Sequence, residues 1–258
     1  MGFPLKFTID TVVTLLLWTY YTLGYIVFFS PFYLLAFIFS GDRETAFQKL
    51  NHLFYKGFFL LARVIIPKQK WRIQDEVLSI RSSVIVCNHL SYLDPILLIS
   101  LFEKQKTIVK SIFFKLPIFG WVLKTSGYIP SATEHGEFAL LTINNVENME
   151  DYLLSGGNLF VFPEGTRSRD TRIGRFNKGA FSIARRCNSP IKVLLIKNTN
   201  LLFRPGKFLF NTCVQNTIEV ELIATIKPDY KSNAFSIPRL MAEVRTLFEN
   251  EQKLTNEK

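Results

Sequence analysis

The sequence predicts an α/β fold, with a largely parallel or mixed sheet sandwiched by helices and a membrane-associated helical segment before it. Two observations lead to this prediction. From Trp71 onward, short apolar runs alternate with amphipathic stretches, which is typical of strands and helices that alternate around a parallel sheet. Residues 11–41, by contrast, contain no charged side chain. We therefore expect an N-terminal membrane anchor and amphipathic helix over residues 1–68 and an α/β domain over residues 69–258.

The uncharged segment is long enough to enter a membrane. As one helix it would exceed the ~30 Å hydrocarbon core of a bilayer. Pro31 is expected to break or kink it, leaving about twenty residues before the proline and about ten after. The segment then fits one membrane-spanning helix or a two-helix hairpin that enters a single leaflet, and a buried core helix is the alternative. A cleaved signal peptide is disfavoured, because no small-residue cleavage site follows.

Basic residues accumulate directly after this segment. They are Arg43, Lys49, Lys56, Arg63, Lys68 and Lys70. By the positive-inside rule, they place the rest of the chain on the cytoplasmic side of an inner or cytoplasmic membrane. Apolar residues also recur at helical spacing between Leu50 and Ala62. The amphipathic helix that they predict would either lie on anionic lipid or pack on the domain.

Five apolar runs in the second part of the chain are expected to form strands. They are residues 83–87, 157–162, 191–196, 208–214 and 218–226. Amphipathic stretches between and after these runs predict helices. The helices cover residues 95–103, 138–154, 178–186 and 237–253.

The composition narrows the class of protein. Of the 258 residues, 48% are hydrophobic, and 31 Lys+Arg against 21 Asp+Glu give a formal net charge of +10. A chain this apolar can bury enough surface to offset its ordering entropy, which excludes intrinsic disorder. Cys87, Cys187 and Cys213 are too few for a disulfide scaffold or a zinc cluster. The basic charge fits nucleic acid, an anionic membrane or a phosphorylated substrate.

Polar residues follow the predicted strand 83–87. Asn88 and His89 come first, and Asp94 stands five residues after His89 and directly before Pro95. Proline favours the first turn of a helix, so Asp94 is expected to cap that helix. A carboxylate turned back toward the imidazole would fix its tautomer, and the pair could take a proton from a hydroxyl. The alternative is a helix cap beside an ordinary turn histidine.

A second polar block, Glu164 to Arg167, follows the predicted strand 157–162. Ligands in open α/β sheets bind beyond the carboxyl ends of strands, so both blocks stand where a ligand is expected. Gly165 lets the backbone approach a ligand closely, and Arg167 offers a rigid fork suited to phosphate. More basic residues follow: Arg169, Arg172, Arg175 and Lys178. The alternative is a solvated basic loop.

The two blocks together, NHLSYLD at residues 88–94 and FPEGTRSR at residues 162–169, resemble those of the glycerolipid acyltransferases typified by 1-acylglycerol-3-phosphate acyltransferases. The resemblance covers about residues 70–225. Three further parts carry it: residues 110–120 with 127–130 resemble the family's second block, residues 176–179 its F-x-K-G element, and residues 190–191 the start of its fourth block.

This resemblance implies an acyltransferase of phospholipid biosynthesis. It would transfer a fatty acyl group from acyl-CoA or acyl-ACP (the acyl carrier protein) to a lysophospholipid hydroxyl, foremost that of 1-acylglycerol-3-phosphate to give phosphatidate. Another lysolipid or a specialised lipid is the alternative acceptor. His89 would be the general base and Asp94 its orienting partner. The implied substrate-binding residues are Asn88, Lys110, Glu164, Gly165, Thr166 and Arg167. We expect no metal, no cofactor and no nucleic acid, and an anionic membrane as a partner.

Two positions depart from the family pattern. Ala132 and Thr133 stand where the second block usually ends in an acidic–basic pair, and Val193 replaces a proline of the fourth block. The first change removes a basic contact to the acceptor's phosphate, so the identity of the acceptor stays open. His52 and His135 have no partner pattern and are expected at the surface or in packing.

Three alternatives compete with this mechanism and function. Cys87 could form an acyl-enzyme, although a small buried core residue is the commoner role for such a cysteine. A nucleic-acid-binding protein would explain the charge but not the uncharged segment. A non-catalytic membrane adaptor would not need the complete set of polar residues. An apolar cluster near the second block fits either an acyl-chain tunnel or ordinary core; it comprises Ile112, Phe113, Phe114, Phe119 and Trp121.

Overall fold

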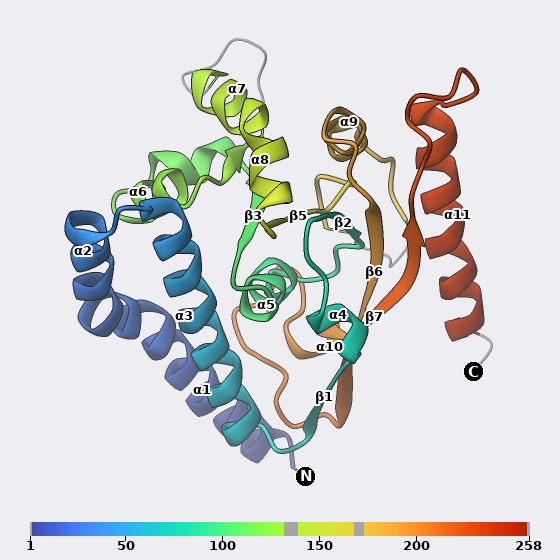
Figure 1. Cartoon of the computed structure of the whole chain (residues 1–258). Helices are drawn as coiled ribbons and strands as arrows, with labels where there is room; N and C mark the ends of the chain where they lie inside the picture. The colour runs from blue at the N-terminus through green and yellow to red at the C-terminus, as the bar shows by residue number, and fades with distance from the viewer. Residues whose placement is uncertain (1, 132–138, 168–172, 257–258) are drawn as a thin grey trace. The chain divides into compact units, whose positions relative to one another are not determined.

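The structure, a computed structural model, describes residues 2–131, 139–167 and 173–256. Its seven strands form one sheet in the order β1-β7-β6-β2-β5-β3-β4 (Figure 1). They are β1 (Gln69–Ile73), β2 (Ser83–Cys87), β3 (Gln105–Val109), β4 (Ile129–Pro130), β5 (Asn158–Val161), β6 (Ile191–Lys197) and β7 (Asn216–Ile226). The pairs β1–β7, β6–β2, β2–β5, β5–β3 and β3–β4 are parallel. The predicted α/β class is therefore confirmed.

Helices flank the sheet along the chain. The first are α1 (Phe3–Thr19), the π-helix η1 (Tyr20–Phe29), α2 (Ser30–Phe39), α3 (Arg43–Ile65), α4 (Asp75–Leu78) and α5 (Leu93–Leu101). The 3₁₀-helix η2 (Ser111–Lys115), α6 (Phe119–Thr125), α7 (Ala139–Glu147), α8 (Met149–Leu154), α9 (Gly179–Arg186), α10 (Thr199–Leu202) and α11 (Ile237–Asn256) follow.

The chain forms two compact units that interleave along the sequence. Unit 1 comprises residues 1–73, 90–103 and 196–220, and unit 2 comprises residues 74–89, 104–195 and 221–258. The chain passes from unit 2 to unit 1 between His89 and Leu90. The predicted boundary between residues 68 and 69 stays a prediction.

The hydrophobic core of unit 2 lies on one face of its strands. Alternate residues of β2, β5 and β6 pack there against α8, α9 and α11. Ile85 and Phe160, which point to the opposite face, are also fully buried. Strands of a parallel sheet are commonly buried on both faces, and this explains why the sequence shows continuous apolar runs at these places.

One predicted strand is wrong and three strands were not predicted. Residues 208–214 form a loop in unit 1, because their backbone N–H groups bond to side chains of α1 instead of a neighbouring strand. The strands β1, β3 and β4 are short or polar and gave no apolar run. The helix predicted over residues 138–154 is two helices, α7 and α8, and residue 138 lies outside the described residues.

The N-terminal apolar segment is helical from Phe3 to Phe39. Pro31 was expected to break or kink this helix, and it does not break it. The chain instead adopts π-helical hydrogen bonding over Tyr20–Phe29 and returns to an α-helix at Ser30, and Figure 1 shows the direction change between α1 and α2. A π-segment can accommodate the carbonyl that the proline ring would otherwise strike. The helix Pro4–Phe39 contains an 18-residue window with a mean hydropathy of 1.9, and it is long and apolar enough to cross a membrane.

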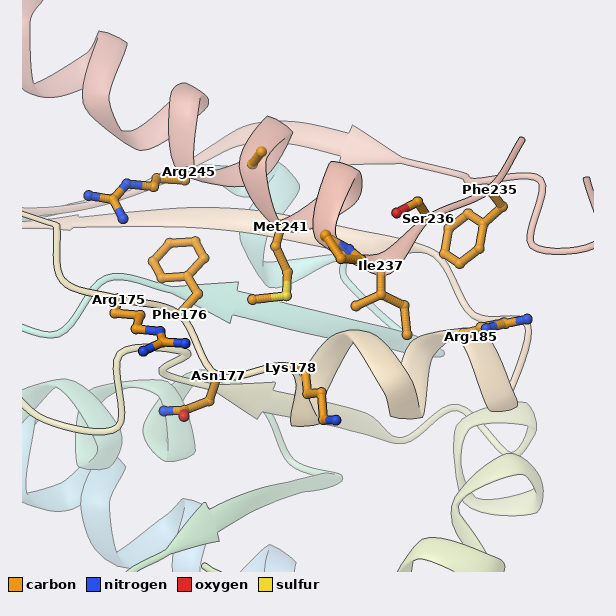
Figure 2. Close-up of a pocket in the computed structure, with 12 residues that line it drawn as sticks. Arg175, Phe176, Asn177, Lys178, Arg185, Phe235, Ser236, Ile237, Met241 and Arg245 are labelled. Atoms are coloured by element: carbon orange, nitrogen blue, oxygen red, sulfur yellow. The ribbon is translucent and has the colours of Figure 1, made fainter. Parts of the chain in front are cut away.

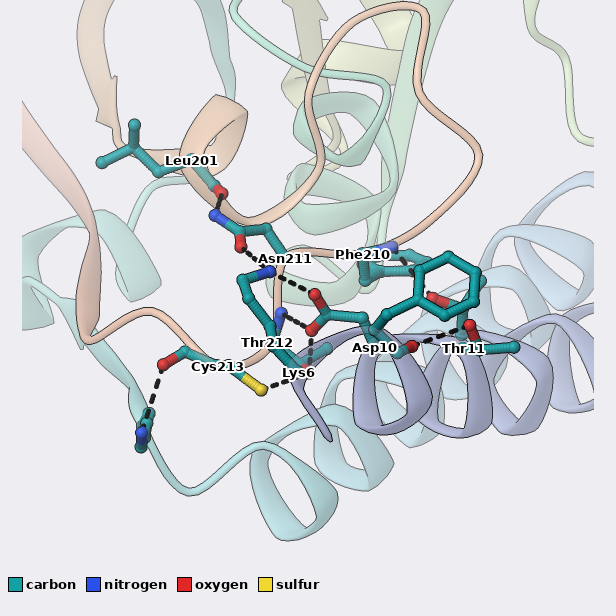
Figure 3. A network of polar contacts seen from close by, with 11 residues as sticks. Lys6, Asp10, Thr11, Leu201, Phe210, Asn211, Thr212 and Cys213 are labelled. Atoms are coloured by element: carbon teal, nitrogen blue, oxygen red, sulfur yellow. Dashed lines mark hydrogen bonds and ion pairs between the residues drawn. The ribbon is translucent and has the colours of Figure 1, made fainter. Parts of the chain in front are cut away.

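A buried polar network fixes α1 within unit 1 (Figure 3). Asp10, which is 5% exposed, accepts hydrogen bonds from the backbone N–H and the hydroxyl of Thr212, at 2.8 and 2.6 Å. Lys6 pairs with the same carboxylate and donates to the side chain of Asn211 at 2.9 Å. Since a buried carboxylate needs such partners, the network ties α1 specifically to residues 210–212.

The amphipathic helix predicted around residues 50–62 is the central part of α3. Its buried face includes Phe54, Phe58 and Ala62, and the helix packs on α5 and α2 within unit 1. Leu53 and Leu60 remain exposed, at 45% and 62%. The structure thus supports packing on the protein for one face, and the contact with anionic lipid stays a prediction.

Candidate active site

Three parallel neighbouring strands of unit 2 bring the sequence blocks to one edge of the sheet. β5 pairs with β2 on one side and with β3 on the other, all in the same direction. Asn88 and His89 follow β2, Glu164 follows β5, and Lys110 follows β3. Because the carboxyl ends of parallel strands share one edge, residues distant in sequence converge there.

The imidazole of His89 lies on Phe162, the first residue of the FPEGTRSR block. Its ring stacks on Phe162 with centroids 4.3 Å apart and planes at 24°. Phe162 also contacts Phe160 of β5 edge-on, which links the stacked pair to the core of unit 2. His89 is half-buried, whereas the preceding Asn88 is only 4% exposed. The stacking therefore orients an imidazole that solvent can still reach.

A tight turn shapes the FPEGTRSR block. The Gly165 N–H donates to the Phe162 carbonyl at 3.0 Å, and Gly165 has φ of +67°. Any Cβ at this position would lie 3.0 Å from the side-chain nitrogen of Asn177. Glycine is therefore required both for the left-handed backbone and for the close approach of a second loop.

That second loop, residues 173–178, is bonded to the turn. Glu164 Oε2 accepts the Gly174 N–H at 2.8 Å, and the Pro163 carbonyl accepts the backbone N–H of Asn177 at 2.7 Å and its side-chain amide at 3.1 Å. Burial raises the pKa of the Glu164 carboxyl, while the backbone N–H groups of Gly174 and His89 and the charges of His89 and Arg245 oppose that rise. One oxygen of Glu164 is thus occupied by the protein itself.

Asp94 is held inside unit 1. Its carboxylate is fully buried, and Oδ2 accepts the N–H groups of Leu90 and Ser91 at 2.6 and 2.7 Å. These are the two residues that follow His89. Asp94 lies in the first turn of α5 without capping it through its side chain, so the expected cap is replaced by a closed turn. The carboxylate therefore fixes the course of the chain directly after the histidine.

Thr199 supplies a further contact that sequence reasoning missed. Its hydroxyl donates to Asp94 Oδ1 at 2.5 Å, and both groups are fully buried. Ser91 Oγ also donates to the Phe203 carbonyl at 2.9 Å, so α10 and the residue after it hold the turn at two points. The available signal was a polar residue shortly after the predicted strand 191–196, whose end the polar motifs did not mark.

The remaining predicted site residues differ in exposure. Lys110 and Thr166 are exposed, and Arg167 is half-buried at the end of the described part of its loop. Ala132, Thr133, His135, Arg169 and Arg172 lie outside the described residues. His52 is half-buried in unit 1, where a ring nitrogen lies 3.1 Å from the Ile99 carbonyl oxygen, and burial lowers its pKa.

The apolar cluster near the second block divides into two groups. Phe114 is 2% exposed and packs in unit 2, whereas Ile112 and Phe113 are 61% and 38% exposed. Phe113 and Phe119 contact each other edge-on, at 6.2 Å between centroids. Ordinary core packing therefore accounts for Phe114 but not for Ile112.

Cys87, the residue on which the alternative covalent mechanism depends, is fully buried in β2. A reactive thiolate needs a partly exposed, electropositive setting. We expect Cys87→Ala to keep nearly full acyltransferase activity, whereas loss of a true nucleophile costs on the order of 10⁴-fold or more in kcat. Single-turnover kinetics of the purified variant test this, and a loss of that size would restore the covalent route.

The chain is similar to known proteins in sequence and in fold. The sequence model of the Acyltransferase family matches residues 69–197, which is half of the chain. A chloroplastic 1-acyl-sn-glycerol-3-phosphate acyltransferase of Brassica napus is 32% identical over 151 residues, covering 58% of this chain and 42% of that protein. The 1-acyl-sn-glycerol-3-phosphate acyltransferase of Saccharomyces cerevisiae is 32% identical over 158 residues, covering 60% and 51%. This chain thus spans about half the length of these curated relatives, or less.

A solved structure matches nearly the whole chain. The 1-acyl-sn-glycerophosphate (LPA) acyltransferase PlsC from Thermotoga maritima aligns over 94% of this chain and 95% of its own, with a TM-score of 0.68 and 22% identity. The two proteins therefore share a fold in which helices flank a sheet. The chain belongs to the acyltransferase family, as the resemblance of its sequence blocks predicted.

Proposed function

We propose that this protein transfers a fatty acyl group from an acyl thioester to the free hydroxyl of 1-acylglycerol-3-phosphate, which gives phosphatidate. The observation that carries the proposal is the position of His89. It is half-buried, stacked on Phe162, and placed at the sheet edge where the polar blocks converge. The names of the relatives support the acceptor, because those proteins are 1-acyl-sn-glycerol-3-phosphate acyltransferases.

In the proposed reaction, His89 acts as a general base. Its imidazole takes the proton of the acceptor hydroxyl while the hydroxyl oxygen attacks the thioester carbonyl carbon. The carbonyl electrons move onto oxygen and form a tetrahedral oxyanion. When this intermediate collapses, the C–S bond breaks and the thiolate leaves with the proton of the imidazolium. The products are an ester and a free thiol, and no acyl-enzyme is required.

Asp94 and Thr199 would act through the histidine. A buried carboxylate in the turn after His89 would favour the imidazolium that forms during attack. Thr199, by its hydrogen bond to Asp94 Oδ1, is a positioning residue that restricts the carboxylate to one orientation. Arg167 and Lys110 would bind the acceptor's phosphate, since a guanidinium and an ammonium are the groups suited to it. We further propose that the apolar helix Pro4–Phe39 enters the membrane that holds the lipid substrate, with the active site on the cytoplasmic side.

An acyl-transfer assay tests the proposed function. The purified full chain, in detergent micelles, is supplied with acyl-CoA or acyl-ACP and with a panel of lysophospholipids. We expect phosphatidate from 1-acylglycerol-3-phosphate to form faster than any other product. A faster reaction with another lysolipid would change the acceptor, which Ala132 and Thr133 leave open. The absence of product with every acceptor and both donors would refute the proposed acyl transfer.

A further inference from the structure

Beside the turn that carries Glu164, unit 2 contains an open cavity of about 940 Å³. Its walls are the loop 173–178, α9 and the first half of α11, and four of its lining residues are basic: Arg175, Lys178, Arg185 and Arg245. We call this cavity, with these four residues, the basic groove. Figure 2 shows Met241 and Ile237 of α11 between Arg175 and Arg245 at one end and Arg185 at the other. Lys178 lies near the middle in this view, so the groove combines an apolar wall from α11 with basic residues along its length.

Two of these cations have no acidic partner within the described part of the chain. Arg175 and Lys178 are exposed and form none of the ion pairs found there. Arg245 bonds to Glu249 at 2.7 Å and to the Ile173 carbonyl at 3.2 Å, so its guanidinium is fixed at the groove wall. Arg185 lies over the ring of Phe235 at 5.5 Å. Basic residues gathered around a cavity create a field that attracts an anionic ligand.

The loop that lines the groove is connected to the turn on which the His89 imidazole lies. This loop is hydrogen-bonded to the Phe162–Gly165 turn through Gly174 and Asn177, and Phe162 stacks on His89. A ligand that is anchored in the groove and has a flexible arm could therefore present a group at the imidazole. Phe176 and Lys178 of the F-x-K-G element line the groove, whereas Lys110 and Arg167, the residues proposed to bind the acceptor's phosphate, do not.

From these observations we propose that the basic groove binds the nucleotide end of acyl-CoA, that is, its adenosine 3′,5′-bisphosphate part. This inference rests on the proposed acyl transfer and assigns a binding site for its donor. The 3′- and 5′-phosphate groups match the groove cations, and an adenine ring matches the apolar surface of Ile237 and Met241. The volume lies within the range of ligand pockets, about 300–1,000 Å³. Arginine forks also bind phosphate and stack on flat rings.

The shape of the groove favours coenzyme A over an acyl carrier protein. Both donors present the acyl thioester at the end of a pantetheine arm, but only coenzyme A carries an adenine and a 3′-phosphate. The folded surface of a carrier protein is too large to enter a cavity of about 940 Å³. The two donors therefore predict different responses to loss of the groove cations.

The test compares the double variant Arg175→Gln/Arg185→Gln with the matched control Lys231→Gln/Arg239→Gln. The control removes the same charge from exposed positions that do not line the groove. Calorimetry with adenosine 3′,5′-bisphosphate and the full chain in detergent should show binding that the groove variant weakens about tenfold or more and the control leaves unchanged. The KM for acyl-CoA should rise equally, while kcat and the KM for the acceptor change little.

Several results would overturn the assignment. An unchanged KM for acyl-CoA, or an equal loss of rate with acyl-CoA and acyl-ACP, would remove the groove from donor recognition. If the groove variant instead lost binding to phosphatidylglycerol vesicles at an unaltered KM for acyl-CoA, the cations would face lipid head groups. If acyl transfer were absent but variant-sensitive nucleotide binding persisted, the proposed function would fail and the groove would still be a nucleotide site.

Discussion

Replacement of His89 by glutamine is expected to lower kcat for acyl transfer by on the order of 10²–10⁴ while the protein stays folded. Glutamine retains a flat amide that can lie on Phe162, but this amide cannot take a proton from the acceptor hydroxyl. His89 is half-buried at the end of β2, so its replacement removes a ring contact and not a core side chain. The measurement is the rate of phosphatidate formation at saturating donor and acceptor, with the thermal midpoint recorded in parallel.

His52 provides the matched control for this experiment. It is also half-buried, its ring nitrogen contacts the Ile99 carbonyl in unit 1, and it belongs to none of the sequence blocks. We expect His52→Gln to lose some stability and little activity. Turnover of His89→Gln at the wild-type rate, in a preparation that is free of endogenous acyltransferases, would eliminate His89 as the base.

The central strands could be predicted because each one shows its burial as an apolar run in its own sequence. Ser83–Cys87 agrees with the predicted strand at both ends, and β5 and β6 differ from prediction by one or two residues. Each of these strands is covered on both faces, and full burial produces an unbroken apolar run. The NHLSYLD and FPEGTRSR blocks could be placed at strand ends for the same reason, since they follow such apolar runs.

The strand β3 could not be predicted, because its burial depends on partners far away in the sequence. It begins Gln105-Lys106-Thr107, and all three side chains are buried. Gln105 accepts a hydrogen bond from the Tyr128 hydroxyl at 2.8 Å, and the ammonium of Lys106 lies 4.3 Å from the ring centre of Tyr152. These contacts with Tyr128 and Tyr152 stabilise the polar side chains of β3 in the interior.

The loop over residues 208–214 shows the opposite error. Its apolar side chains suggested a strand, yet Trp18 of α1 stacks on Phe208 and contacts Phe210. Thr14 accepts the N–H of Phe210 at 2.9 Å. An apolar helix thus provides both the burial and the hydrogen bonds that a neighbouring strand would give, and no pattern within residues 208–214 could indicate this.

The same loop helps to explain how the turn after His89 is kept in place. Phe203 stacks on Phe210 with centroids 4.5 Å apart, and its carbonyl accepts the Ser91 hydroxyl. Within unit 1, contacts therefore run from α1 through the loop to the turn that encloses Asp94. The sequence blocks contain Asp94 at one end of this series of contacts. They do not indicate the rest of it, because the intermediate residues are ordinary aromatic and hydroxyl side chains.

Asp94→Asn separates the charge of this carboxylate from its structural role. An asparagine carbonyl oxygen can accept the Leu90 and Ser91 N–H groups as Oδ2 does, and its amide can donate to Thr199, whose hydroxyl can then accept. The turn should survive, but the negative charge that we propose stabilises the His89 imidazolium is lost. We expect kcat to fall by on the order of 10²–10⁴ at a nearly constant KM for the acceptor. Asp94→Ala should in addition lower the thermal midpoint, because it leaves two buried N–H groups unpaired.

Thr199 variants show whether orientation of the carboxylate matters beyond its charge. Thr199→Val keeps the shape of the side chain and removes the hydroxyl that donates to Asp94 Oδ1, so kcat should fall about tenfold while the KM values stay constant. Thr199→Ser, which retains the hydroxyl, should recover most of that loss. A residue with a purely structural role would show parallel losses of stability and activity in both variants. Equal activity of the valine and serine variants would mean that the two backbone N–H groups of Leu90 and Ser91 suffice to hold Asp94.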